Sequence, residues 1–184
     1  EGFTIQNATV SPVTILGNVT MKNCRFTANH TREYAGAVYG YQANVILTDC
    51  VFSNNTSTAY GGALYFVLSN LTIQNCHFIG NQSNGPGGAA MLDGTTLFAE
   101  QCVFSGNSAG RGGGIFFQSI ANESTTSIST LSKCVFEMNT ARNGNGGGLF
   151  ISGQTVALND SRITANLGSG AYLINAELNV NNSN

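Results

Sequence analysis

The feature that most constrains the fold of this chain is a hexapeptide that returns at a fixed interval. Five copies follow the pattern Cys-x-Phe-x-x-Asn, and they begin at Cys24, Cys50, Cys76, Cys102 and Cys134. The first four cysteines are 26 residues apart, and the fifth follows after 32. A further copy, SRITAN, has Ser161 in place of Cys and Ile163 in place of Phe. A short, regular repeat predicts a solenoid, in which each repeat forms one coil that packs on its neighbours.

Two other elements recur in the same frame and indicate the secondary structure. Twelve residues after the first four cysteines lies a glycine of a Gly-Gly-Ala-like element: Gly36, Gly62, Gly88 and Gly114. Apolar residues also alternate just before each cysteine, as Val45 and Leu47 do. Alternation is the period of a strand, and Asn, Gly, Ser and Thr between the segments favour turns. The sequence therefore predicts an all-β, right-handed parallel β-helix of about seven coils, with three short strands in each.

The domain organisation follows from this repeat. Residues 1–184 are expected to form a single β-helix domain, because a propeller blade needs about 40 residues and the unit here is too short. The longer coil predicts a loop insertion over residues 118–132, which are rich in Ser and Thr. No capping element is recognisable at either terminus, so we expect a fragment of a longer solenoid.

The composition excludes several functions. Charged residues are only 9% of the chain, against roughly 25% in an average domain, and Lys and Arg together number seven. So few cations cannot displace the counterions of a nucleic acid. No apolar run is long enough to span a bilayer, so we expect no membrane insertion of this segment.

The repeated positions are expected to form structural ladders inside the solenoid. An Asn at a corner can hydrogen bond to the Asn of the next coil. The predicted Asn ladder consists of Asn29, Asn55, Asn81, Asn107 and Asn139. The predicted cysteine ladder consists of Cys24, Cys50, Cys76, Cys102 and Cys134, which we interpret as stacked buried thiols. One or two disulfides and a metal array are the alternatives; no Cys-x-x-Cys or nearby His supports a metal.

The sequence does not provide a catalytic group or a cofactor site. Asp49 and Asp160 share a column but lie four coils apart, too far for a pair of glycosidase carboxylates. Glu100, Glu137 and the two histidines fall in different columns or coils. Glu137 and Arg162 are expected to form a weak surface ion pair. We therefore expect a protein that is not an enzyme and that binds no cofactor and no metal.

The outer side of the third strand is predicted to carry an apolar stripe. If Ala37 and Tyr39 and their equivalents point inward, their neighbours point outward. The candidate partner-facing residues are Val38, Leu64, Phe66, Leu92, Phe116, Phe150, Tyr172 and Ile174. Such a stripe indicates contact with the rest of its own chain, with a protein partner or with glycans.

Ten Asn-x-Ser/Thr sequons suggest glycosylation in a secretory pathway. Those in the Asn ladder are expected to be protected. Asn18, Asn70 and Asn122 are the better candidates, since they lie before strands or in a loop.

The alternation of Phe-x-x-Asn with Gly-Gly-Ala-(Ile/Leu/Val) resembles the repeats of the polymorphic outer membrane proteins of chlamydiae. Phe52 with Asn55 is one match to the first motif, and Gly61 to Leu64 is the cleanest match to the second. The copies depart from the pattern at Ala35, Ile163 and Ser169. The resemblance implies a surface-exposed β-helical passenger used for adhesion, without catalytic residues.

The expected function is that of an extracellular or cell-surface structural or adhesive segment: a stalk, an adhesin or a filament-assembly module. The alternative is a non-catalytic portion of a carbohydrate-active β-helix, similar to polysaccharide lyases or hydrolases.

Overall fold

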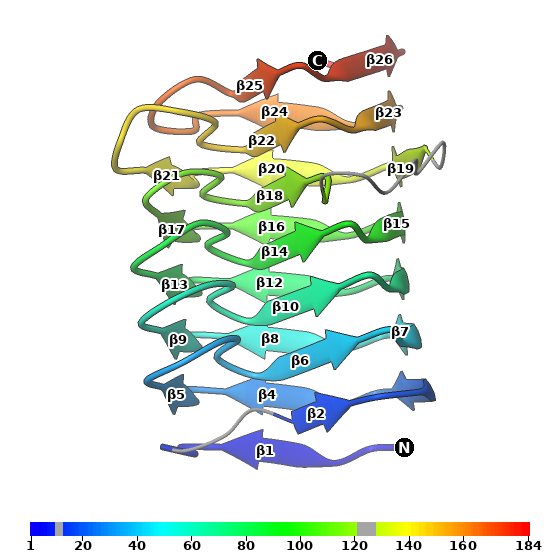
Figure 1. The fold of residues 1–184 in the computed structure, drawn as a ribbon, viewed down its shortest axis with the longest axis vertical. Coiled ribbons are helices and arrows are strands. Elements are labelled where there is room, and N and C mark those ends of the chain that lie inside the picture. Colours follow the sequence, from blue (N-terminus) through cyan, green and yellow to red (C-terminus); the bar gives the residue numbers. More distant parts are fainter. Residues whose placement is uncertain (10–12, 121–127) are drawn as a thin grey trace.

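The computed structural model describes residues 1–9, 13–120 and 128–184. All regular secondary structure in this part of the chain is β-strand, and every pairing between strands is parallel. The strands stack into sheets that run the length of the molecule (Figure 1). Each coil visits the sheets in a fixed order, which we call C, A, D and B. The predicted parallel β-helix is confirmed, with a small fourth sheet, D, added to the three that the sequence indicates.

Sheets A and C are formed by the segments around the cysteines. Sheet A contains β1 (Thr4–Gln6), β4 (Arg25–Thr27), β8 (Val51–Ser53), β12 (His77–Ile79), β16 (Val103–Ser105), β20 (Val135–Glu137) and β24 (Arg162–Thr164). Sheet C contains β3 (Asn18–Lys22), β7 (Asn44–Thr48), β11 (Asn70–Gln74), β15 (Thr96–Glu100), β19 (Ser129–Ser132), β23 (Thr155–Asn159) and β26 (Glu177–Asn181). Each cysteine lies at the corner between the two sheets, after the strand of sheet C and before that of sheet A.

Sheets D and B follow in each coil. Sheet D has two-residue strands: β5 (His30–Thr31), β9 (Thr56–Ser57), β13 (Gln82–Ser83), β17 (Ser108–Ala109) and β21 (Thr140–Ala141). Sheet B contains β2 (Val13–Ile15), β6 (Val38–Tyr41), β10 (Leu64–Val67), β14 (Ala90–Asp93), β18 (Ile115–Gln118), β22 (Leu149–Ser152) and β25 (Ala171–Ile174). The glycine-rich turns connect D to B.

The interior is filled by columns of like side chains, one from each coil. The phenylalanines of sheet A stack with rings within 3° of parallel and centroids 4.6–4.9 Å apart. This column consists of Phe26, Phe52, Phe78, Phe104 and Phe136, all fully buried. Apolar residues of sheet C, such as Leu47 and Ile73, pack against it. Burial of repeated apolar side chains is what holds successive coils together.

The close approach of successive coils explains why the turn between sheets D and B contains glycine. A Cβ on Gly62 would overlap the backbone carbonyl of Gly88, which lies one coil away. Gly61, just before it, has a φ of 61°, a left-handed conformation that glycine adopts without strain. The backbones of successive coils therefore approach so closely here that no side chain fits between them.

The predicted insertion over residues 118–132 is shorter than expected. Gln118 ends β18 and Ser129 begins β19, so both ends of that range are strand. Thr130 pairs with Phe98 of the preceding coil, so the extra residues lie within the connection 119–128 and leave the register of sheet C intact. No helix long and apolar enough to cross a membrane occurs among the described residues.

Candidate interaction surface

The outer side of sheet B carries a column of large side chains, one in each of six coils. Register pairs them in the order Tyr39, Tyr65, Met91, Phe116, Phe150 and Tyr172, which we call the aromatic column. The rings of Phe116 and Phe150 stack with centroids 4.4 Å apart, and Phe150 lies 5.2 Å from Tyr172. Met91, Phe116 and Phe150 form a cluster separate from the main core, with Tyr65 packed against them. An apolar column on an outer face is therefore real, although its members differ from those expected.

The middle of the aromatic column is covered by the protein itself. Phe116 and Phe150 are only 5% and 1% exposed, although both point away from the core. A Cβ on Gly112 would meet the Phe116 backbone and Cβ, and one on Gly146 would meet the Phe150 nitrogen. The glycine turns thus fold back over the strands that follow them, and the face is open mainly at its ends.

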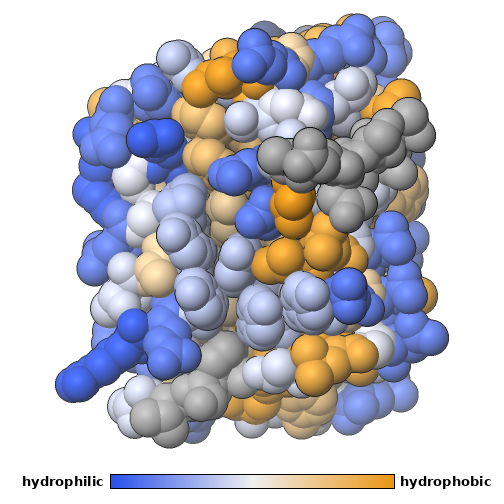
Figure 2. Space-filling model, in the orientation of Figure 1, coloured by the Kyte–Doolittle hydropathy of each residue, from blue (hydrophilic) through white to orange (hydrophobic). Residues whose placement is uncertain are grey.

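The open end of the face holds a tyrosine cluster. Five of the six tyrosines of the chain lie here: Tyr34, Tyr39, Tyr41, Tyr60 and Tyr65. Tyr34 and Tyr60, from successive D-to-B turns, stack within 7° of parallel at 5.6 Å. Both also contact Tyr65, at 5.4 and 5.6 Å between ring centroids. Figure 2 looks onto this face, and pale side chains of intermediate hydropathy gather over β6 and β10.

Burial affects the acidity of two tyrosines in this cluster and of the nearby Asp93. Burial, followed by the negative charge of Asp93, raises the pKa of Tyr65 above its ordinary value. Burial, followed by the neighbouring Tyr41, also raises the pKa of Tyr39. Burial alone raises the pKa of the Asp93 carboxyl, whose Oδ1 is buried without a hydrogen-bond partner. Tyr39 and Tyr65 thus keep their hydroxyl protons at neutral pH and remain hydrogen-bond donors.

A groove with mixed polar and apolar lining adjoins the aromatic column two coils further along. It has a volume of about 260 Å³ and is lined by Asn84, Gly85, Pro86, Gly110, Arg111, Phe116, Gln118 and Asn143. Arg111 is exposed and takes part in neither of the two ion pairs found among the described residues. The nearby Arg142 is committed elsewhere, because its guanidinium donates to Ser108 Oγ and the Ser83 carbonyl. Arg111 is thus the cation available in this groove, which we call the Arg111 groove.

The orientation predicted for half of the candidate partner-facing residues is wrong. Val38, Leu64, Phe66 and Leu92 are fully buried in the main core, whereas Tyr39 and Tyr65, expected inside, point outward. Phe116, Phe150, Tyr172 and Ile174 do lie on the outer side. The error arises because the turn before β18 is one residue shorter: Gly88 is opposite Gly113 rather than Gly114. A slip of one residue exchanges the two faces of a strand.

The predicted Asn positions form a continuous internal ladder. The Nδ2 of each Asn donates to the Oδ1 of the Asn one coil further on, at 2.9–3.0 Å. The ladder consists of Asn29, Asn55, Asn81, Asn107 and Asn139, and it is extended by Asn166. The same Oδ1 atoms accept backbone N–H groups, and Nδ2 of Asn81 also donates to the Phe52 carbonyl. These amides satisfy buried backbone groups at the A-to-D corner.

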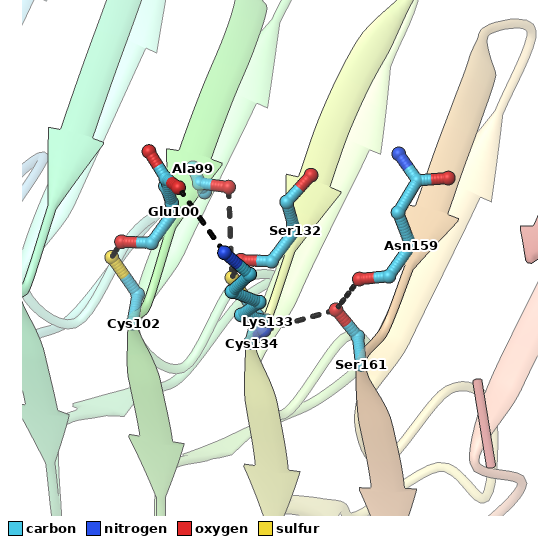
Figure 3. A network of polar contacts seen from close by, with 8 residues as sticks. All are labelled: Ala99, Glu100, Cys102, Ser132, Lys133, Cys134, Asn159 and Ser161. Atoms are coloured by element: carbon cyan, nitrogen blue, oxygen red, sulfur yellow. Dashed lines mark hydrogen bonds and ion pairs between the residues drawn. The ribbon is translucent and has the colours of Figure 1, made fainter. Parts of the chain in front are cut away.

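The predicted cysteine positions form a second internal column of unpaired, buried thiols. The thiol of Cys134 donates to the Ser132 carbonyl at 3.4 Å and contacts the Ala99 carbonyl at 3.7 Å (Figure 3). Ser161 continues the column, and its hydroxyl donates to the Asn159 carbonyl at 2.8 Å. Cys24, Cys50, Cys76 and Cys102 also donate to the carbonyl two residues before them. The column therefore fills space and caps carbonyls at the C-to-A corner.

The acidic side chains remain dispersed among the described residues. Asp49 accepts from Nδ2 of Asn75 at 3.2 Å, and Asp160 lies in the same corner column several coils away. Glu137 pairs with Arg162 at 3.3 Å, and Glu100 lies 3.9 Å from Lys133, both at exposed positions. No group of three or more His, Cys, Asp or Glu side chains is placed to hold a metal in the described ranges. The acidic side chains therefore form no cluster in the described ranges, whereas the aromatic side chains gather on the outer side of sheet B.

Two of the candidate glycosylation sites lie on the outer side of sheet C. Nδ2 of Asn70 donates to Oδ1 of Asn44, and Nδ2 of Asn44 donates to Oδ1 of Asn18, both at 2.9 Å. All three are exposed and border a shallow groove with Ile46 and Thr72. Asn122 lies outside the described residues. Asn18 lies at the start of this external ladder and takes part in it as an acceptor, through Oδ1.

Comparison with known proteins agrees with this architecture. A family model for the right-handed beta-helix region matches residues 1–130, which is more than half of the chain. Neither the curated proteins nor the solved structures gave a match. The match extends over the cysteine, Asn and glycine repeats of the first coils and supplies the handedness that the sequence predicts. The chain belongs to the right-handed beta-helix family.

Proposed function

We propose that this chain is a non-enzymatic structural or adhesive segment of an extracellular or cell-surface protein, and that the outer face of sheet B holds its partner. The observation that carries the proposal is the aromatic column, which ends in an open cluster of five tyrosines. Tyrosine rings that stay on a surface are characteristic of sites that bind another molecule.

The interior supports a role as a rigid spacer. Its Phe, Asn and thiol columns repeat without interruption through the middle coils, and they satisfy the buried polar groups there. The Phe-x-x-Asn motif that resembles chlamydial polymorphic outer membrane proteins supplies two of these columns. In its more specific form, the proposal is that the chain is a surface-exposed passenger of that type, used for adhesion.

Adhesion by whole cells tests this function. The chain would be displayed on a non-adherent bacterium through an autotransporter, and binding to cultured epithelial cells would be counted against cells that carry the empty display vector. Display is expected to increase adhesion, and the double variant Tyr34→Ser/Tyr60→Ser to return it toward background. The matched control is Ile46→Ser/Phe98→Ser, which removes similarly exposed apolar side chains from sheet C. Adhesion no greater than that of the empty vector, or equal loss in both variants, would contradict the proposal.

The proposal that the chain is not an enzyme needs a separate test. The acidic side chains lie in different columns or, like Asp49 and Asp160, several coils apart, and this separation supports the absence of an acid–base pair. Incubation of the purified chain with a panel of pectins, xylans and glucans is expected to release no reducing ends. Release that exceeds a heat-denatured sample would instead favour a carbohydrate-active β-helix.

A further inference from the structure

The tyrosine cluster is organised before any partner arrives. Tyr34 and Tyr60 stack on each other, and Tyr39 and Tyr65 lean against Tyr34 at 29° and 45°. Successive rings are held in register by the backbone hydrogen bonds of the coils, such as the Ala35 nitrogen to the Tyr60 carbonyl. Because the side chains are already fixed, binding costs less conformational entropy than on a mobile surface.

The way these rings pack argues against a platform for sugar rings. Tyr34 and Tyr60 stack along the axis of the solenoid, so each covers a face of the other. Tyr65 tilts by 52° against Tyr60 and blocks the side of that pair. The cluster therefore presents ring edges and hydroxyls to solvent. It does not present the row of open ring faces on which sugar rings stack. Such an array suits the irregular surface of a protein.

The chemistry of the whole strip matches protein interfaces. Tyr, Phe, Met and Arg are the residues enriched at their centres, whereas Lys and Glu are depleted. Tyr34, Tyr60 and Arg111 are exposed on this strip, whereas Met91 and Phe116 are buried beside them, on a scaffold rich in Gly, Asn and Ser. Rigid tyrosines among small polar residues are also the composition of antibody paratopes.

Arg111 decides which side chain the partner presents. The turn column runs from Tyr34 through Tyr60 and Pro86 to Arg111, joined by the bonds Gly61 nitrogen to Pro86 carbonyl and Gly87 nitrogen to Arg111 carbonyl. Arg111 thus lies two coils from Tyr60, about 10 Å at the usual strand spacing. Arg111, Gln118 and Asn143 all line a groove of about 260 Å³, too small for most organic ligands but sufficient for one side chain.

We infer that the tyrosine cluster and the Arg111 groove form one recognition site for a protein partner that inserts an Asp or Glu side chain beside Arg111. The guanidinium offers two parallel N–H donors to a carboxylate, and the amides complete the hydrogen bonds. The tyrosines supply the apolar contact that excludes water around this ion pair. This inference rests on the proposed function, because it names the partner of the same face.

Selection from a random peptide library tests the inference. Phage-displayed dodecapeptides would be selected on the purified chain, and the dissociation constants of synthetic versions would be measured by fluorescence anisotropy. The selected peptides are expected to share an Asp or Glu next to an aromatic or aliphatic residue. Arg111→Gln and Tyr34→Ser/Tyr60→Ser are each expected to weaken binding about tenfold or more. Arg25→Gln and Ile46→Ser/Phe98→Ser, at exposed positions of sheets A and C, are the matched controls and should change binding less than twofold.

Two results would overturn the inference. Peptides without an acidic residue, or binding that Arg111→Gln leaves unchanged, would remove the carboxylate from the site. Tighter binding of an oligogalacturonate than of any peptide, with the same dependence on Arg111 and the tyrosines, would show that the ligand is a saccharide. Cell adhesion that still needs Tyr34 and Tyr60 after either result would leave the proposed function in place. Circular dichroism and thermal unfolding of every variant would establish that each one folds.

Discussion

Individual side chains in this interior are matched to the neighbour one coil away. Gly40 points into the core, at a place where the following coils have Phe66 and Leu92. A Cβ on Gly40 would overlap the ring of Phe66, so the absence of a side chain in one coil makes room for the large ring in the next. Close packing of this kind leaves little tolerance for added volume.

Gly40→Ala is therefore expected to destabilise the protein by about 1–3 kcal/mol, because Phe66 must leave its present rotamer. Gly17→Ala is the matched control, since no atom lies within 4 Å of a Cβ added there. The free energy of unfolding in guanidinium chloride would show the difference. Equal stability of the two variants would contradict the packing argument.

Positions in the cysteine column require a small side chain that can donate a hydrogen bond to the carbonyl two residues earlier. Cys76 donates to the Gln74 carbonyl at 3.3 Å, and Ser161 makes the same bond in its own coil with a hydroxyl. Cys76→Ser is thus expected to cost less than about 1.5 kcal/mol, and Cys76→Val more, because valine adds bulk and cannot donate to the Gln74 carbonyl. Chemical denaturation would rank the two. The thiols of the native protein should also resist Ellman's reagent until it unfolds, since all five are buried.

Asp93 gives the stability a dependence on pH. Folding raises the pKa of this carboxyl, so the folded protein keeps a proton that the unfolded chain has released. Its stabilising contribution is complete below the ordinary Asp pKa of about 3.9 and is lost as the pH rises through the folded value. Asp93→Asn should therefore gain stability relative to the wild-type chain as the pH rises from below to above the ordinary Asp pKa. Thermal unfolding of both proteins across this range would test the sign, and parallel curves would count against it.

At the scale of the element, the Asn ladder ties the A-to-D corners together. Asn81 receives hydrogen bonds from the backbone and side chain of Asn55, and it donates to Asn107 and to the Phe52 carbonyl. Asn166 makes fewer such bonds, because it accepts from Asn139 but has no Asn above it. The middle of the ladder thus holds more buried polar groups than its end.

Asn81→Ala is expected to cost about 3 kcal/mol or more, because it leaves buried donors and an acceptor without partners. Asn166→Ala should cost roughly half as much, since its site is only partly buried. Urea unfolding of both variants provides the comparison. A larger loss for Asn166→Ala would show that the ladder does not act through buried bonds.

The elements also show what could be predicted from sequence. The Cys-x-Phe-x-x-Asn copies keep constant spacing within themselves, so the Phe, Asn and thiol columns follow directly. Sheet B follows a turn of variable length, and its register is set by the close approach of Gly88 to Gly113, which spacing from Cys102 does not reveal. The tyrosine cluster was missed for the same reason, because Tyr39 and Tyr65 were assigned to the wrong face. The available signal is the Tyr two residues before a glycine of the turn, at Tyr34 before Gly36 and at Tyr60 before Gly62.

At the scale of the whole molecule, each coil is a unit that bonds mainly to its immediate neighbours, although Arg142 also reaches the Ser83 carbonyl two coils away. Deletion of residues 50–75 removes one complete repeat and returns Cys76 to the place of Cys50. The shortened chain is expected to fold with the same circular dichroism per residue and a modestly lower midpoint of thermal unfolding. Deletion of residues 50–74, one residue fewer, should disrupt the fold, because it displaces every later column. Similar behaviour of the two deletions would contradict a register held by columns.

The parallel stacking also governs how the molecule responds to force. The N- and C-termini of the described chain lie at opposite ends of the stack, and the hydrogen bonds between coils run along its axis (Figure 1). Tension between these ends passes through every coil, and the outermost coil opens first because it has a neighbour on one side only. Each 26-residue coil that opens releases roughly 90 Å of extended chain. A stack that opens this way lengthens in steps and dissipates energy at each one.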